Sequence, residues 1–225
     1  MIPENYYITQ IDGKLATEIQ IKHHYLRRRA SVMYAFALKD KQTDEIKGVI
    51  TYGMPPSDKV RKGICGTDEK SKVIELNRLW ISDDVGKNAE SWLVANSMKY
   101  VKYDIIISYA DPSEGHLGTI YQALNGIYYG LSSKHIDPKP KHVRAGQGVH
   151  PKALNNKHST AELKNPDEFE YIQRVQKHRY VFFNCDKRRK RELLGKLKYD
   201  IRPYPKVLNS QLNGISQISG QSVLS

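Results

Sequence analysis

The chain has 225 residues, of which 39% are hydrophobic, a length typical of one domain with a single core. It contains no run of about 18 apolar residues, its first residues lack the pattern of a signal peptide, and its two cysteines show no disulfide or metal spacing. We therefore expect a cytoplasmic protein without a membrane span. The net charge of +12 favours a polyanionic partner, although a merely basic soluble protein is the alternative.

Basic residues gather in three parts of the chain. They are HHYLRRR at 23–29, KPKHVR at 139–144 and KRRKRELLGKLK at 187–198. If the fold brings these clusters onto one face, that face would bind the phosphates of a nucleic acid. The residues expected to do so are Arg27, Arg28, Lys139, Lys141, Arg144, Arg188 and Arg189.

Hydrophobic periodicity predicts helices and strands in alternation. The expected elements, in chain order, are a helix at 15–30, a strand hairpin at 32–39 and 46–53, a loop at 54–71, a strand at 72–82, a helix at 89–101, a strand at 104–108, a helix at 118–125, a strand at 126–133, a strand at 178–185 and a helix at 186–198. If the first helix continues through the first basic cluster, His24, Arg27 and Arg28 share one helical face.

The order of these elements favours a mixed α/β fold, with a central twisted sheet flanked by helices. We expect one domain over 1–206, with a polar and basic insert at 132–165 and a flexible tail at 207–225. Two strand–helix crossovers are central in this order. In such sheets ligands bind at the carboxyl ends of the strands, where the segments 83–91 and 109–122 lie.

The turn DDVGKNAES at 83–91 precedes a helix whose free amide groups could hold a pyrophosphate. Gly86, Asn88 and Ser91 are the candidate residues. An ordinary connection between a strand and a helix also uses glycine and asparagine, so this alternative stays open.

The stretch YADPSEGHLGTIYQ at 109–122 follows an apolar strand directly. An apolar floor would raise the pKa of Asp111 and make it a useful base, and Tyr121 could donate a hydrogen bond to a developing oxyanion. The alternatives are a turn-forming aspartate before Pro112 and a half-buried helical tyrosine. His24, Asp111 and His116 could together form a mixed nitrogen and oxygen set for iron or zinc.

Several segments resemble the Mom family of bacteriophage DNA-modification proteins. They are KHHYLRRR, ELNRLWISDDVGKNAESWLVA, YADPSEGHLGTIYQALNG, KHRYVFF and PYPK. The resemblance implies a single domain like the Gcn5-related N-acetyltransferases (GNAT-like). It also implies methylcarbamoylation of adenine N6 in double-stranded DNA, which protects the DNA from host restriction enzymes. The functional positions it implies are His24, Tyr25, Asp111 and Tyr121, with Arg78 and Ser91 binding the donor.

The implied acyl donor is either acetyl-coenzyme A or an activated glycine such as glycyl-tRNA. The segment DDVGKN departs from the usual acetyltransferase loop, Gln/Arg-x-x-Gly-x-Gly/Ala, and its acidic residues would repel a pyrophosphate. This favours glycine, and with it tRNA as a second partner. Two other functions are left open: a non-enzymatic DNA-binding protein, and an acetyltransferase with a substrate other than DNA.

Overall fold

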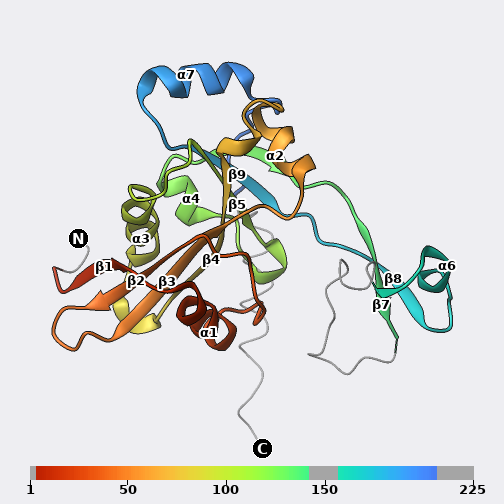
Figure 1. Cartoon of the computed structure of the whole chain (residues 1–225), viewed down its shortest axis with the longest axis horizontal. Helices are drawn as coiled ribbons and strands as arrows, with labels where there is room; N and C mark the ends of the chain where they lie inside the picture. Colours follow the sequence, from red (N-terminus) through yellow and green to blue (C-terminus); the bar gives the residue numbers. More distant parts are fainter. Residues whose placement is uncertain (1–3, 142–156, 207–225) are drawn as a thin grey trace, which may run out of the picture.

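A computed structural model describes residues 4–141 and 157–206 (Figure 1). Its main sheet has seven strands in the order β1-β2-β3-β4-β5-β9-β6, and β7 and β8 form a separate pair. The elements are β1 (Tyr6–Gln10), α1 (Gly13–His23), β2 (Tyr34–Asp40), β3 (Ile46–Gly53), α2 (Asp58–Cys65), η1 (Lys70–Lys72), β4 (Val73–Ile81), η2 (Asp83–Val85), α3 (Ala89–Met98), β5 (Ile105–Ala110), η3 (Pro112–Glu114), α4 (Thr119–Ala123), β6 (Ile127–Leu131), β7 (Ile136–Pro140), α6 (Thr160–Leu163), β8 (Phe169–Gln173), β9 (His178–Phe183) and α7 (Lys187–Lys196).

Strand direction confirms the predicted mixed α/β fold. β1 to β4 form an antiparallel meander, whereas β4 and β5 are parallel and joined through α3. The second predicted crossover, β5–α4–β6, is also present. β9 is inserted between β5 and β6 and is antiparallel to both.

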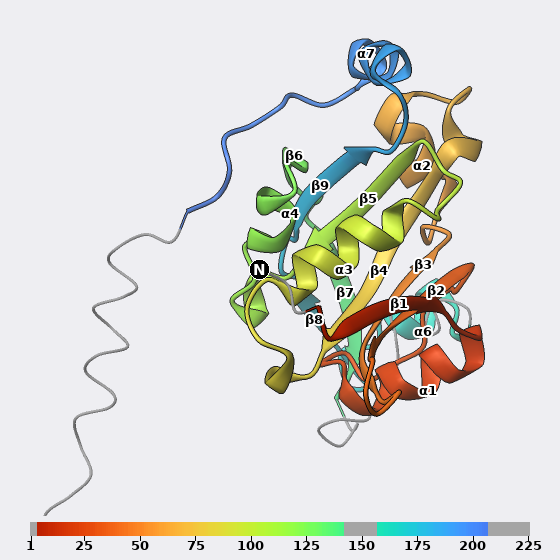
Figure 2. The same cartoon turned by 90° about the vertical axis from the view of Figure 1, so that its left-hand side faces the viewer.

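Each face of the sheet carries its own core because apolar residues alternate along the strands. On one face, Leu93 of α3 and Tyr121 of α4 pack against a cluster that includes Ile106. On the other face, α2 and α7 cover a second cluster that includes Ile105. α1 packs on this second face over β2 and β3. Figures 1 and 2 show the two layers of helices.

The sheet opens between its two central parallel strands. β4 pairs with β5 only through Val73–Leu76, which lie opposite Ile105–Ser108. Beyond this point β4 pairs with β3, and β5 pairs with β9. A bulge in the β3–β4 pairing leaves Asn77 as an extra residue of β4, which increases local twist. The carboxyl ends of β4 and β5 therefore diverge, and we call the space between them the wedge.

The first predicted helix is wrong in its second half. α1 ends at His23, His24 is extended, and Arg27 has a φ of +42°. The ring Nδ1 of His24 accepts the Leu26 amide at 3.1 Å, which replaces the next helical turn by a local turn. His24, Arg27 and Arg28 consequently do not share a helical face.

Other segments also differ from the prediction. The expected loop at 54–71 contains α2 and η1, because the Ser57 side chain accepts the Val60 amide and caps a short helix. β1 was not predicted. The insert 132–165 contains β7 and α6, which with β8 form an arm that projects from the sheet (Figure 1). Arg144 and the tail 207–225 lie outside the described residues. Within the described ranges no helix has the length and apolar character needed to cross a membrane.

The basic clusters do not form the single face that was expected. α7 lies at the opposite end of the molecule from α1 in both Figure 1 and Figure 2. Arg189 of α7 is held by Glu69, Asp104 and Glu192 and is therefore part of the packing. Arg27, Arg28, Lys141 and Arg188 are exposed, and Lys139 is paired with Glu170 at 3.1 Å.

Candidate functional site

The segment that follows α1 is fixed against β4 at the wedge. Buried Gln20 of α1 donates to the Thr51 hydroxyl at 3.1 Å, and Thr51 donates to Asn77 at 2.8 Å. Asn77 in turn donates to the Ser31 carbonyl at 2.7 Å. Gly53 permits this approach, since a Cβ at that position would lie 1.9 Å from the Ser31 oxygen. The loop that carries His24 and Tyr25 is thus tied to the bulge of β4.

Three aromatic rings meet beside the wedge. The His24 and Tyr25 rings stack with centroids 4.4 Å apart, and Tyr25 meets His116 edge-on at 5.7 Å. His24 is buried, whereas the Tyr25 side chain is 40% exposed. Residues from the first basic cluster and from the 109–122 segment therefore come together.

Asp111 lies in the same group but its environment differs from the prediction. Its carboxylate pairs with Lys177 at 2.8 Å and accepts the Ser113 amide at 3.1 Å. Burial acts to raise its pKa, but the hydrogen bonds to Lys177 and Ser113 outweigh burial and hold the pKa below its usual range. The predicted rise in pKa is wrong, and Asp111 is ionised and only weakly basic at neutral pH.

The predicted metal site is not formed. Burial and the charge of Arg78 lower the pKa of His24 to about 4, so the ring is neutral near pH 7. Its Nδ1 accepts the Leu26 amide, which leaves the proton on Nε2 as a donor. Asp111 is paired with Lys177. Across residues 4–141 and 157–206, no group of three or more histidine, cysteine, aspartate or glutamate side chains is placed to hold a metal ion. His24, Asp111 and His116 therefore do not form a metal site.

Tyr121 approaches the wedge from the other face of the sheet. Its ring packs against Tyr180 at 5.3 Å and against Phe182 at 6.1 Å. Burial raises the pKa of its phenol, the Ser108 hydroxyl lowers it, and the charge of Glu75 raises it further. Tyr121 is therefore a neutral donor that reaches the point where β4 and β5 separate.

Glu75 is a functional candidate that the sequence analysis missed. It lies on β4 opposite Ile107, immediately before the strands separate. Burial raises the pKa of its carboxyl to about 7, against the opposing charges of Arg78 and Lys177. In the described part of the chain it makes no side-chain hydrogen bond or ion pair, so its lone pairs are free to accept a proton. A glutamate between Val73 and Asn77 in an apolar strand was the available signal.

The predicted donor-binding residues divide between the two faces. Arg78 lies on the α1 face, where its charge acts on His24 and its buried Nε finds no hydrogen-bond partner among the described residues. Gly86, Asn88 and Ser91 lie at the amino end of α3, on the opposite face. Ser91 donates to the Asn88 carbonyl at 3.0 Å, and Asn88 has a φ of +68°. The structure therefore gives α3 an exposed amino end but does not bring Arg78 to it.

Comparisons with known proteins find relatives by sequence and by structure. The model of the Mom protein family matches residues 5–206. The methylcarbamoylase Mom of Escherichia phage Mu is 28% identical over 204 residues, which cover 84% of this chain and 79% of that protein. Among solved structures, Arabidopsis thaliana NAA60 in complex with acetyl-CoA has 11% identity and a TM-score of 0.47, with 79% of this chain and 98% of that one covered. A GNAT-family acetyltransferase from Bacillus cereus has 11% identity and a TM-score of 0.43, with 80% and 99% covered.

Proposed function

Because this chain belongs to the Mom protein family, we propose that it is a transferase that modifies adenine N6 in phage DNA and so shields that DNA from host restriction. The family match carries the proposal, and the named methylcarbamoylase of phage Mu supports the type of modification. The wedge, with groups on both of its sides, supports a reaction between an acceptor and an acyl donor.

The acceptor amine needs a proton acceptor because its lone pair is delocalised into the adenine ring. We assign this role to Glu75, whose carboxyl has a pKa of about 7 and no competing partner among the described residues. Asp111, which stays ionised beside Lys177, would accept a hydrogen bond from the amine and orient it. The adenine would leave the duplex and stack on Tyr25, whose ring is 40% exposed.

The donor would enter from the α3 and α4 face. The amino end of α3 at Asn88 offers free amides to an anionic group of the donor. Tyr121 donates a hydrogen bond to the oxyanion that forms on the carbonyl of the donor. Acetyl-coenzyme A and an activated glycine both present such a carbonyl. Asp83 and Asp84 precede this end of α3, and Lys47 pairs with Asp84 at 2.9 Å. Because acidic residues here would repel the pyrophosphate of coenzyme A, they favour the glycine donor.

A glycyl donor also accounts for the product. Attack of N6 on the glycyl carbonyl expels the carrier and gives N6-glycyladenine. Attack of the glycyl amine on ring C6 then breaks the bond from C6 to the original N6, which becomes the amide nitrogen. The result is the methylcarbamoyl isomer, with no carbon–carbon bond formed. Feeding labelled glycine to expressing cells should label the modified base, and label entering from acetate alone would exclude this donor.

Mass spectrometry of nucleosides tests the function directly. DNA from cells that express the protein should contain methylcarbamoyl adenine. The Asp111→Ala and Tyr121→Phe variants should lose at least about 100-fold of the modification, the scale of one lost orienting or oxyanion contact. The Glu192→Gln variant, at a carboxylate 47% exposed on α7, is the matched control. Unmodified adenine with the wild-type chain would favour a non-enzymatic DNA-binding protein or an acetyltransferase with another substrate.

A further inference from the structure

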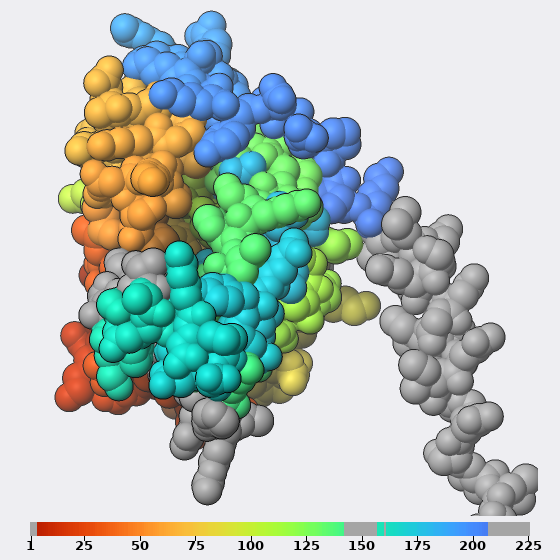
Figure 3. Space-filling model, turned by 90° about the vertical axis from the view of Figure 1, so that its right-hand side faces the viewer, coloured from red at the N-terminus to blue at the C-terminus, as the bar shows by residue number. Residues whose placement is uncertain are grey.

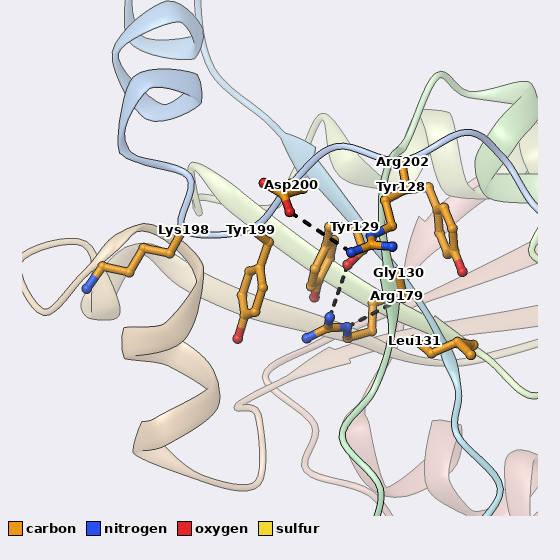
Figure 4. Close-up of a pocket in the computed structure, with 9 residues that line it drawn as sticks. All are labelled: Tyr128, Tyr129, Gly130, Leu131, Arg179, Lys198, Tyr199, Asp200 and Arg202. Carbon is orange, nitrogen blue, oxygen red and sulfur yellow. Dashed lines mark hydrogen bonds and ion pairs between the residues drawn. The ribbon is translucent and has the colours of Figure 1, made fainter.

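A cavity of about 490 Å³ lies beside the β6 edge of the sheet (Figure 4). It is separate from the residues assigned above. Its walls come from β6, from β9 and from the segment that follows α7. They are Tyr128, Tyr129, Gly130, Leu131, Arg179, Lys198, Tyr199, Asp200 and Arg202.

One wall is a guanidinium that lies against two neighbouring phenol rings, Tyr129 and Tyr199, whose own centroids are 5.2 Å apart. Arg179 lies 4.6 Å from the centroid of Tyr129 and 4.5 Å from that of Tyr199. Its Nη2 donates to the Tyr129 carbonyl at 3.0 Å, which fixes the plane of the group. In Figure 4 the three side chains line the cavity together. A rigid wall of this kind suits a flat aromatic ligand, because stacking on it costs little side-chain entropy.

A buried donor in this wall has no partner. Tyr129 is 2% exposed, and its hydroxyl makes no hydrogen bond with any described residue. An unsatisfied buried hydroxyl costs free energy unless a ligand or water pairs with it. The hydroxyl has almost no solvent-accessible surface, so it lies behind the wall of the cavity and is not a group that a ligand in the cavity would meet.

The rim of the cavity is basic. Lys198 and Arg202 are exposed. Among the described residues that line the cavity, Asp200 alone is acidic, and its 90% exposed side chain is 4.0 Å from Arg202. Gly130 has a φ of +88° and lets the Arg202 side chain lie over β6, where a Cβ would come within 3.4 Å of it. Cations at the rim and an aromatic wall inside match the two halves of a nucleotide.

The cavity lies on the same face of the sheet as Glu75. Arg179 of β9 lies opposite Tyr109 of β5. Two residues earlier on β5, Ile107 lies opposite Glu75 of β4. The charge of Glu75 acts on both Tyr109 and Tyr129. The row Glu75, Tyr109, Arg179 and Tyr129 therefore runs across the strands from the wedge into the cavity.

We propose that this cavity binds one nucleotide of the DNA strand that flanks the target adenine. Its base lies against the wall that Arg179 and Tyr199 form over Tyr129. Lys198 and Arg202 hold its phosphate. The inference rests on the proposed function in that it takes DNA as the substrate.

Binding of a fluorescent single-stranded oligonucleotide to the full chain tests the site. Tyr199→Leu removes the aromatic ring, Tyr129→Phe removes only the hydroxyl, and Arg202→Gln removes an exposed charge. We expect Tyr199→Leu to weaken binding by about 5- to 100-fold, as for loss of one stacked base. Arg202→Gln should weaken it by about 5-fold. Tyr129→Phe, which removes a hydroxyl behind the wall, should leave it unchanged. Tyr204→Leu, on the same segment but outside the cavity, is the control.

The outcomes separate this inference from the proposed function. Cross-linking of a bromodeoxyuridine oligonucleotide should map to the peptide that contains Tyr199. If the wild-type chain binds and modifies DNA while Tyr199→Leu and Arg202→Gln bind it as tightly and the cross-link maps elsewhere, the cavity is not a nucleotide site and the proposed function stands. If the wild-type chain neither binds nor modifies DNA, both fail. Thermal melting shows which variants are folded. If a tyrosine variant does not fold, Arg202→Gln still tests the site, because Arg202 is exposed and its substitution should not affect folding.

Discussion

Two carboxylates near the wedge have opposite environments, and this difference assigns their roles. Asp111 is paired with Lys177 at 2.8 Å, so it holds its charge and binds a proton weakly. Glu75 has no such partner in the described chain, and burial raises the pKa of its carboxyl to about 7. A group that takes a proton at neutral pH works best with a pKa near that pH. Glu75 therefore meets the requirement for the base, and Asp111 that for a fixed hydrogen-bond acceptor.

The Glu75→Gln variant should show opposite effects on activity and on stability. Modification should fall at least about 100-fold, and the wild-type rate should rise with pH through about 7 as the carboxyl ionises. The folded pKa lies above the ordinary 4.5, so the folded state binds the proton more tightly than the unfolded state does. This contribution to stability is present below pH 4.5 and lost as the pH rises through 7.

The glutamine variant keeps a neutral group at every pH. Its free energy of unfolding at pH 8 should therefore exceed that of the wild type by about 1–3 kcal/mol, with no such gain at pH 4. Urea denaturation at the two pH values measures this difference. A variant that modifies DNA at the wild-type rate at pH 8 would remove Glu75 from the mechanism.

At the scale of elements, α7 is joined to the sheet by one buried carboxylate. Glu69, 5% exposed, precedes β4 and binds both Arg189 and Lys196 of α7, the latter at 2.7 Å. The hydrogen bonds to Arg189 hold the pKa of Glu69 below its ordinary value. α7 also buries Leu193 against the second core. The basic composition of α7 therefore serves packing as well as surface charge.

Loss of the Glu69 charge should destabilise the fold without affecting the wedge. We expect Glu69→Gln to lower the free energy of unfolding at pH 7 by about 1–3 kcal/mol, since Arg189 and Lys196 lose a charged partner. Because the folded pKa is depressed, this stabilisation is present above the unfolded pKa of 4.5 and is lost as the pH falls through the folded value. Thermal melting between pH 3 and 7 measures it. Equal losses in Glu192→Gln, whose carboxylate is 47% exposed, would contradict the special role of Glu69.

Strongly periodic elements were predictable, and those defined by tertiary contacts were not. Alternation in β2, β3 and β4 is sufficient to identify them, because their apolar residues line one or both cores. α2 was missed because it is short and polar, and its start depends on the cap at Ser57. The end of α1 was missed because the His24 ring accepts the Leu26 amide, and hydrophobic periodicity carries no information on such a local contact.

The candidate site was predictable only in part. The resemblance named His24, Tyr25, Asp111 and Tyr121, and the structure brings the first three to one side of the wedge and Tyr121 to the other. Glu75 could not be ranked from the sequence, because its burial and the nearby charges of Arg78 and Lys177 arise only in the folded chain. The sign of the pKa shift of Asp111 was wrong because Lys177, 66 positions along the chain, is its partner.

At the scale of the whole molecule, the wedge gives the reactants separate approaches. The loop after α1 and the base of the arm lie on one side. Ser132, at the base of the arm, donates its amide to the Lys177 carbonyl at 2.8 Å, and its hydroxyl accepts the Lys177 amide at 2.9 Å. The side chain of Lys177 in turn pairs with Asp111. α3 and α4 lie on the other side (Figure 2). In the space-filling view of the arm side, α7 lies at one end and the arm and α1 at the other (Figure 3). In the proposed binding mode DNA reaches the wedge from the α1 side, and Lys187 and Arg188, at the amino end of α7, are expected to lie away from it.

This arrangement predicts that equal losses of charge will have unequal effects on DNA binding. Arg27→Ala with Arg28→Ala removes two exposed cations next to His24, and Lys187→Ala with Arg188→Ala removes two exposed cations from α7. The first pair should reduce the slope of log affinity against log salt by about 2, because each lost phosphate contact contributes about 0.9. The second pair should leave the slope unchanged. Fluorescence anisotropy with duplex DNA over a series of salt concentrations measures both slopes. An equal loss of slope in the α7 variant would mean that DNA binds through the net charge of the whole surface and not specifically on the α1 side of the wedge.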